Sequence, residues 1–217
     1  MSFDVTLSFD NGPEPEVTPG VLDTLARQDL RASFFVLGRK LALPGRRDLA
    51  VRAKAEGHWI ANHTYSHETP LGLLDGNDVA EREIGRTQAL IGDLAHPDRF
   101  FRPFGGQGRI GPHLLSPAVV EYLKSGGYSC VIWNSIPRDW ENIENWPEVA
   151  LAQCRRQPWS LVVVHDVKPA PMAQLGRFIE LVRGAGGRFR QDFPPDCMPI
   201  FRGQEAMPLA PYVAEVA

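Results

Sequence analysis

Cysteine is scarce in this 217-residue sequence, and its three cysteines form no CxxC or CxxH pair. They are Cys130, Cys154 and Cys197. An odd number without paired spacing argues against a disulfide framework and against a structural zinc knuckle. We therefore expect reduced and mostly buried thiols.

Long apolar runs and an excess of charge of one sign are also missing. No run approaches the length of a membrane span, so we expect no membrane partner. The 23 Lys and Arg against 26 Asp and Glu give a net charge of −3, without the basic balance that a nucleic-acid partner favours. The N-terminal segment MSFDVTLSFD carries Asp4 where a signal peptide has basic residues, and we expect a cytoplasmic protein. Nothing in the sequence indicates an oligomeric state.

Short strand-like runs alternate with longer helical patterns along the chain. Strands are expected at residues 3–9, 32–37, 58–62, 99–102, 128–133, 160–165 and 188–190. Helices are expected at residues 17–28, 46–56, 77–94, 116–125, 147–156 and 172–184. This alternation predicts an α/β domain with a parallel sheet covered by helices, and both a barrel and an open doubly wound sheet fit it. We expect one domain over residues 1–217, with an irregular C-terminal extension over residues 194–217.

Side chains that can bind a metal or move protons follow nearly every expected strand. In chain order they are Asp10 and Asn11, His63 and His67, Arg102, Asp139 and Trp140, and His165 and Asp166. The carboxyl ends of parallel strands meet at one edge of a sheet or one mouth of a barrel. We therefore expect these side chains to meet in a single site.

A metal site is the first expectation for this group. His63 and His67 are spaced i, i+4, which brings two imidazoles together if the segment turns helically. Two unrelated surface histidines are the alternative. An oxygen from Asp10 or Asn11 would complete three protein ligands and leave positions for water or substrate, as a catalytic zinc site requires.

The other candidates also have structural alternatives. Asp10 before Asn-Gly suits a turn, although a turn does not explain the histidines. Arg102 could pair with a surface acid, but its apolar flank indicates a buried guanidinium with a carboxylate partner. His165 could be a core residue, although its place at a strand end favours a site. Trp140 and Phe104 could be core aromatics or a platform for a sugar ring.

Five short segments, in this order, resemble the motifs of the polysaccharide deacetylases with the NodB homology domain, carbohydrate esterase family 4. The family segments are TFDDGP, HSxxH or HTxxH, RPPxG, a DxxDW-like segment and LxLxH. The matching segments are SFDNGP at 8–13, HTYSH at 63–67, RPFGG at 102–106, IPRDW at 136–140 and LVVVH at 161–165. The resemblance covers roughly residues 5–166. It implies a distorted (β/α) barrel, often with seven strands, in agreement with the number expected above.

The resemblance also implies a role for each matched residue. The implied catalytic residues are the general base Asp10, the general acid His165, Arg102, which orients the base, and Asp139, which tunes the acid. The implied ligands of a divalent metal, Zn²⁺ in the first place and Co²⁺ as a second choice, are Asn11, His63 and His67. The implied substrate-binding positions are Phe104, Gly105, Trp140, Leu161 and Val163.

Three positions depart from the family motifs. Asn11 stands where the family has a metal-binding Asp, Ile136 where it has the first Asp of the fourth segment, and Phe104 where it has the second Pro. A neutral amide oxygen coordinates a metal but supplies no charge, so we expect weaker metal binding. Ile136 and Phe104 are expected to alter the groove and the substrate.

The leading hypothesis is a metal-dependent hydrolase that removes N-acetyl groups from an acetylated amino sugar, chitooligosaccharide-like or peptidoglycan-like, and releases acetate. One alternative is a hydrolase of small-molecule amides or cyclic ureides on the same fold, working with or without a metal. Another is a catalytically weak carbohydrate-binding relic, for which Asn11 is the main support. The presence of Asp10, Arg102, Asp139 and His165 argues against the relic, because binding alone needs no proton relay.

Overall fold

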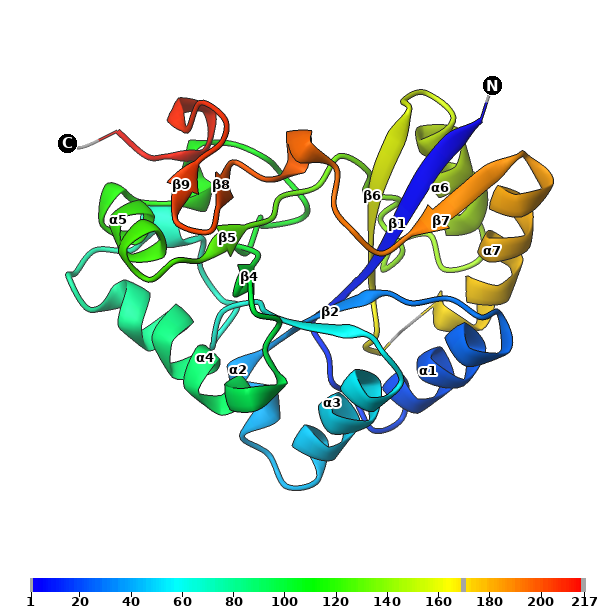
Figure 1. The fold of residues 1–217 in the computed structure, drawn as a ribbon, viewed down its shortest axis with the longest axis horizontal. Helices are drawn as coiled ribbons and strands as arrows, with labels where there is room; N and C mark the ends of the chain where they lie inside the picture. The colour runs from blue at the N-terminus through cyan, green and yellow to red at the C-terminus, as the bar shows by residue number, and fades with distance from the viewer. Residues whose placement is uncertain (1, 169–170, 216–217) are drawn as a thin grey trace.

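The computed structural model describes residues 2–168 and 171–215. One curled sheet forms its centre, and helices lie around the outside of the curl (Figure 1). The strands are β1 (Phe3–Asp10), β2 (Ser33–Val36), β3 (Trp59–Asn62), β4 (Phe100–Phe101), β5 (Ser129–Cys130), β6 (Trp159–His165), β7 (Gly187–Arg190), β8 (Ile200–Phe201) and β9 (Gln204–Glu205).

The strand order is β6-β1-β2-β3-β4-β5-β8-β9, and β7 pairs with the first half of β1. All pairings among β1 to β7 are parallel. An isolated parallel bridge between Ser135 and Val162 links the chain beyond β5 to β6. The expected distorted (β/α) barrel with about seven parallel strands is therefore confirmed.

Every residue of β1 is buried, because the strand lies in the middle of the sheet with neighbours on both edges. Successive side chains of a strand point to opposite faces. Leu7 and Phe9 pack into a core cluster that includes residues of the helices, where Phe9 stacks on Phe34 with ring centroids 5.0 Å apart. Ser8 and Asp10 therefore point to the inside of the curl, and this alternation aims Asp10 at the site.

The helices are α1 (Thr18–Arg27), α2 (Gly38–Leu41), α3 (Arg46–Ala55), α4 (Arg86–Ile91), α5 (Pro117–Ser125), α6 (Trp146–Cys154) and α7 (Leu175–Gly184). Proline in the first turn of α1, α5 and α6 suits a position whose N–H has no helical partner. The helix expected over residues 77–94 is wrong as a continuous α-helix. A π-helical segment, Glu81–Gly85, precedes α4, and a 3₁₀ turn, Gly92–Leu94, follows it.

The C-terminal segment, residues 194–215 in the described part, contains two short strands that the sequence pattern does not indicate. β8 pairs antiparallel with β5, and β9 pairs antiparallel with β8. The backbone N–H of Ile132 also donates to the carbonyl of Cys197, at 2.8 Å. The strand expected over residues 128–133 is shorter in the structure, where β5 covers Ser129–Cys130. Beyond it, Val131 still donates to the carbonyl of Phe101 at 2.8 Å, and Ile132 bonds to the C-terminal segment.

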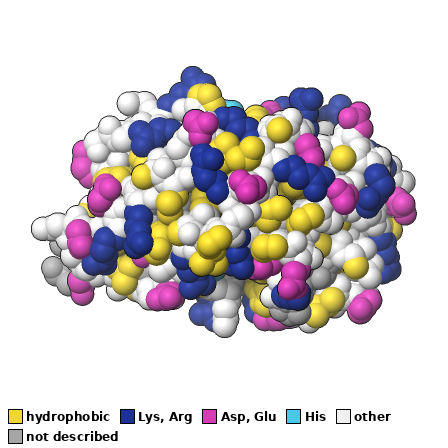
Figure 2. Space-filling model, turned by 90° about the horizontal axis from the view of Figure 1, so that it is seen from below, with side chains coloured by type: hydrophobic (Ala, Val, Ile, Leu, Met, Phe, Trp, Pro, Cys, Tyr) yellow, Lys and Arg dark blue, Asp and Glu magenta, His cyan; other side chains and the backbone are white. Residues whose placement is uncertain are grey.

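The three cysteines are free and buried, as their number and spacing in the sequence predict. Within residues 2–168 and 171–215, no helix has the length and apolarity needed to cross a bilayer. On the face shown in Figure 2, Lys and Arg side chains are interspersed with Asp and Glu side chains. That face offers no continuous basic surface to a polyanion.

Candidate active site

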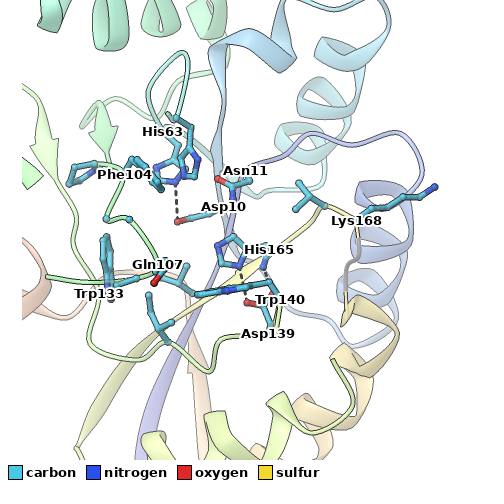
Figure 3. Close-up of a pocket in the computed structure, with 18 residues that line it drawn as sticks. Asp10, Asn11, His63, Phe104, Gln107, Trp133, Asp139, Trp140, His165 and Lys168 are labelled. Atoms are coloured by element: carbon cyan, nitrogen blue, oxygen red, sulfur yellow. Dashed lines mark hydrogen bonds and ion pairs between the residues drawn. The ribbon is translucent and has the colours of Figure 1, made fainter. Parts of the chain in front are cut away.

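A pocket opens where the carboxyl ends of β1 and β6 meet the loops that follow β3, β4 and β5. Most of the residues singled out in the sequence contribute to its lining. They are Asp10, Asn11, His63, His67, Phe104, Gly105, Asp139, Trp140, Val163 and His165. Phe104 and Trp133 lie on one side of it and Lys168 on the other (Figure 3). The structure thus brings together groups from strand ends that are far apart in the sequence.

Arg102 lies behind the pocket and is fully buried. Its Nη1 donates hydrogen bonds to Asp10 Oδ1, at 2.6 Å, and to Ser8 Oγ, at 2.8 Å. The guanidinium also sits 3.8 Å above the centre of the Phe35 ring. Burial lowers the pKa of Arg102 from its ordinary value, and the adjacent Asp10 carboxylate opposes that shift. Because Arg102 holds Oδ1, the other oxygen of Asp10 is left for the pocket.

His63 presents one ring nitrogen to Asp10. Its Nδ1 lies 2.8 Å from the carbonyl oxygen of Arg102 and must carry the proton, since a carbonyl only accepts. The unprotonated Nε2 then lies 3.4 Å from Asp10 Oδ2. Burial, together with the charges of Arg102 and His165, lowers the pKa of His63 to about 3, so this contact is not an ion pair at neutral pH.

His67 lies beside His63, with ring centroids 4.7 Å apart. Burial and the neighbouring His63 lower the pKa of His67 to about 2. Both imidazoles are therefore neutral at neutral pH, which is the form that binds a metal ion.

The loop that joins the two histidines is not helical, yet it still brings the two imidazoles side by side. Thr64 and His67 have positive φ angles of 67° and 53°. The carbonyl groups of Thr64 and Tyr65 accept hydrogen bonds from the N–H groups of Gly38 and Arg39 in α2, at 3.0 and 3.1 Å. The backbone thus bonds to a neighbouring helix, and this tertiary contact, together with the positive φ angles, gives the loop its shape without a helical turn.

Asn11 follows β1 with a φ of 73°, in the left-handed region where Asn is favoured among non-glycine residues. Its side-chain Oδ1 is buried and has no hydrogen-bond partner among the described residues. A buried acceptor without a partner is costly, and a cation would satisfy it. The amide oxygen and the neutral imidazoles of His63 and His67 therefore fit a divalent ion chemically. No cluster of three or more His, Cys, Asp or Glu side chains suited to a metal occurs in the described part.

His165 ends β6, and two hydrogen bonds connect it to Asp139. Its Nδ1 lies 2.8 Å from Asp139 Oδ1, and its backbone N–H donates to Asp139 Oδ2 at 2.9 Å. Burial acts to lower the pKa of His165, but the charge and hydrogen bond of Asp139, with smaller effects from the charges of Asp10 and Asp166, outweigh it and raise the pKa above its ordinary value. Trp140 meets the His165 ring edge-on, with centroids 5.0 Å apart. His165 is thus suited to donate a proton into the pocket from Nε2.

One substrate-binding position expected from the sequence lies elsewhere, and one pocket residue was not expected. Leu161 does not line the pocket and instead packs in the core, because it lies two residues farther from the carboxyl end of β6 than Val163. Trp133 lines the pocket although it belongs to none of the sequence motifs. Its Nε1–H donates to the carbonyl of Gly108 at 3.2 Å. A Cβ atom on Gly105 would lie 2.5 Å from the Trp133 ring, so the ring requires glycine there. The position of Trp133 at the end of an expected strand was the available signal.

A carboxylate that accepts protons and an imidazole that donates them, placed in one pocket, are the two groups that acid–base hydrolysis needs. Fold and site together thus indicate a hydrolase. The family model for polysaccharide deacetylase matches residues 2–131. The chain is 33% identical over 171 residues to a chitooligosaccharide deacetylase of Sinorhizobium fredii, covering 76% of this chain and 73% of that protein. The chain belongs to the polysaccharide deacetylase family.

Two further relatives support this assignment. A peptidoglycan-N-acetylglucosamine deacetylase of Bacillus cereus is 28% identical over 190 residues, covering 85% of this chain and 84% of that protein. Among solved structures, a family 4 carbohydrate esterase from Streptomyces lividans in complex with acetate superposes with a TM-score of 0.73 at 26% identity. The superposition covers 91% of this chain and 97% of the esterase.

Proposed function

We propose that this protein is a metal-dependent N-deacetylase that removes the acetyl group from an acetylated amino sugar and releases acetate. The observation that carries the proposal is the arrangement of two pairs at one pocket, Asp10 with Arg102 and His165 with Asp139. Family membership supports it, as do relatives named for chitooligosaccharides and for peptidoglycan N-acetylglucosamine. The proposed substrate is accordingly a chitooligosaccharide-like or peptidoglycan-like sugar.

The two pairs divide the proton transfers between them. Asp10, with Oδ1 held by Arg102, accepts the proton of the attacking water at its other oxygen. His165, kept protonated by Asp139, donates a proton from Nε2 to the nitrogen of the leaving amine. The water oxygen forms a bond to the acetyl carbon and the amide C–N bond breaks, which gives acetate and a free amino sugar.

Asn11, His63 and His67 are the residues that would hold a divalent ion, Zn²⁺ in the first place and Co²⁺ as the alternative. Such an ion polarises the acetamide carbonyl and lowers the pKa of a bound water. The unpartnered Oδ1 of Asn11 and the two neutral imidazoles support this assignment. His63 is also fixed from behind by the Arg102 carbonyl, as metal-binding histidines usually are.

The rest of the pocket is mostly apolar and suits the faces and the acetyl methyl of an amino sugar. We assign the substrate-facing wall to Phe104, Gly105, Trp140 and Val163, and add Trp133 and Ile136. All these residues lie within residues 1–217, which we propose act as a single deacetylase domain, with the segment from residue 194 onward extending its sheet.

Acetate release tests the proposal directly. Metal-stripped protein is incubated with chitooligosaccharides or peptidoglycan fragments, with and without added Zn²⁺ or Co²⁺. We expect acetate only when an ion is added, and very little from Asp10→Asn or His165→Ala. Undiminished turnover in either variant, or no acetate from either substrate with any ion, would show the assignment to be wrong. Turnover of small amides or cyclic ureides without acetate release would instead favour the small-molecule alternative.

A further inference from the structure

The loop between His63 and His67 is held from two sides by side chains and backbone that lie outside the pocket. On one side, α2 donates to its carbonyl groups, as described above. On the other side, the N–H groups of Tyr65 and Ser66 both donate to a single oxygen, Glu83 Oε2, at 3.0 and 2.9 Å. Hydrogen bonds to a carboxylate are about twice as strong as those between neutral groups. Glu83 therefore fixes the middle of the loop that carries the two imidazoles.

Glu83 is itself placed by the π-helical segment Glu81–Gly85. Single-turn π segments are rare and occur frequently at functional sites. The same segment also anchors the start of the loop: Asn62 at the end of β3 donates to the carbonyl of Ile84 at 2.9 Å and accepts from the N–H of Thr64 at 3.1 Å. Two consecutive residues of the π segment, Glu83 and Ile84, thus bond to the loop and to the strand end that precedes it.

The conformation of the loop needs such support. Thr64 and His67 both have positive φ angles, and for a β-branched residue such as Thr64 this is a true outlier. Residues in sparsely populated backbone regions cost about 1–3 kcal/mol each and persist only where their surroundings hold them. The bonds to Glu83 and those from α2 are the contacts that hold the loop in this conformation.

We propose that Glu83 is a positioning residue that fixes the relative placement of the His63 and His67 imidazoles. It does not line the pocket. It acts through the backbone of Tyr65 and Ser66. Its consequence for metal binding rests on the function proposed above, in which the two imidazoles hold the ion, whereas its effect on the loop does not.

Three variants test this role. Glu83→Ala removes both hydrogen bonds, whereas Glu83→Gln keeps an amide oxygen that can accept them. Glu81→Ala is the matched control: Glu81 lies in the same π segment, but its Oε2 accepts from the Tyr122 hydroxyl at 2.8 Å. Two quantities are measured: the dissociation constant and visible spectrum of Co²⁺, and the hydrogen-exchange rates of the Tyr65 and Ser66 amides in metal-free protein.

We expect Glu83→Ala to weaken Co²⁺ binding by about 10- to 100-fold and to alter the Co²⁺ spectrum. Glu83→Gln should recover most of the affinity, and Glu81→Ala should resemble the wild type. In metal-free protein, exchange at Tyr65 and Ser66 should be faster in Glu83→Ala than in Glu81→Ala. If the wild type binds no ion, the metal part of the proposed function fails, and the exchange rates alone decide the role of Glu83. Wild-type exchange in Glu83→Ala, wild-type Co²⁺ affinity in that variant, or equal effects in Glu81→Ala would overturn the proposal.

Discussion

Asp139 accepts two hydrogen bonds from His165. One carboxylate oxygen accepts from the ring Nδ1–H at 2.8 Å, and the other accepts from the backbone N–H at 2.9 Å. The contact fixes the ring orientation and leaves Nε2 for the pocket. The negative charge also raises the pKa of the imidazole against the opposing effect of burial. A single buried carboxylate thus sets both the direction and the protonation state of the proposed acid.

The first prediction concerns the pH profile. A general acid must be protonated, so activity is lost as pH rises through the His165 pKa. Because Asp139→Asn removes the charge that raises this pKa, the alkaline limb of the kcat/KM profile should move to lower pH. Glu141→Gln is the control, since Glu141 is exposed and pairs with Arg138. An alkaline limb that stays in place in Asp139→Asn would remove Asp139 from the role of tuning His165.

The second prediction concerns the stability of the Asp10–Arg102 pair. Asp10→Asn leaves a fully buried guanidinium without its counter-charge. We expect the free energy of unfolding, measured by urea denaturation, to fall by about 3–5 kcal/mol. The double variant Asp10→Asn with Arg102→Met should regain much of that stability, because no unpaired charge remains, yet stay inactive. If Asp10→Asn is as stable as the wild type, the pair is not the buried ion pair described here.

The third prediction concerns Asn11 as a ligand. Asn11→Asp supplies a charged oxygen at the same backbone position and should bind Zn²⁺ more tightly, as measured by isothermal titration calorimetry. Asn11→Gly keeps the positive φ but has no side-chain oxygen, and should bind more weakly than the wild type. Equal affinities in all three proteins would count against Asn11 as a ligand.

The fourth prediction concerns acid stability away from the pocket. His58 is buried, and its Nδ1 accepts the N–H of Ala32 at 3.1 Å. Burial lowers its pKa to about 4. The charge of Glu56 opposes this shift and the charge of Arg31 adds to it, both with smaller effects. The unfolded chain, with a pKa near 6.5, binds a proton first as the pH falls. This contribution to stability is therefore complete above pH 6.5 and is lost as the pH falls towards about 4.

The loss attributable to His58 should be on the order of 3 kcal/mol, from the conversion of a pKa difference into free energy. His58→Asn is the comparison, because its side-chain oxygen can accept the Ala32 N–H without titrating. The unfolding free energies of both metal-free proteins are measured between pH 4 and 7. As the pH falls, the free energy of the wild type should decrease more steeply than that of His58→Asn, so the difference between the two proteins shifts by this amount. Parallel curves would mean that His58 does not titrate in this range.

Seven strands and most helices could be predicted because their hydrophobic patterns are local. The run LVVV in β6 and the buried sequence of β1 each carry their own signal. The strands β8 and β9 lie in a proline-rich segment without a strand-like apolar run, and β8 forms by pairing with the edge of β5 that β4 leaves free. The π segment Glu81–Gly85 was not predicted, because its residues fit the pattern of the amphipathic helix expected over residues 77–94.

The sequence by itself determined which side chains end the strands, and hence that Asp10, His63, Arg102 and His165 meet, because parallel strands align their carboxyl ends. The tertiary structure decided how they meet. Asp10 and Arg102 are 92 positions apart, and only the folded sheet sets their 2.6 Å contact. Likewise, the left-handed conformation of the His63–His67 loop depends on α2 and on the segment before α4, which no local pattern in the loop encodes. Local periodicity depends only on neighbouring residues, whereas the geometry of a site depends on contacts between segments that are distant in the sequence.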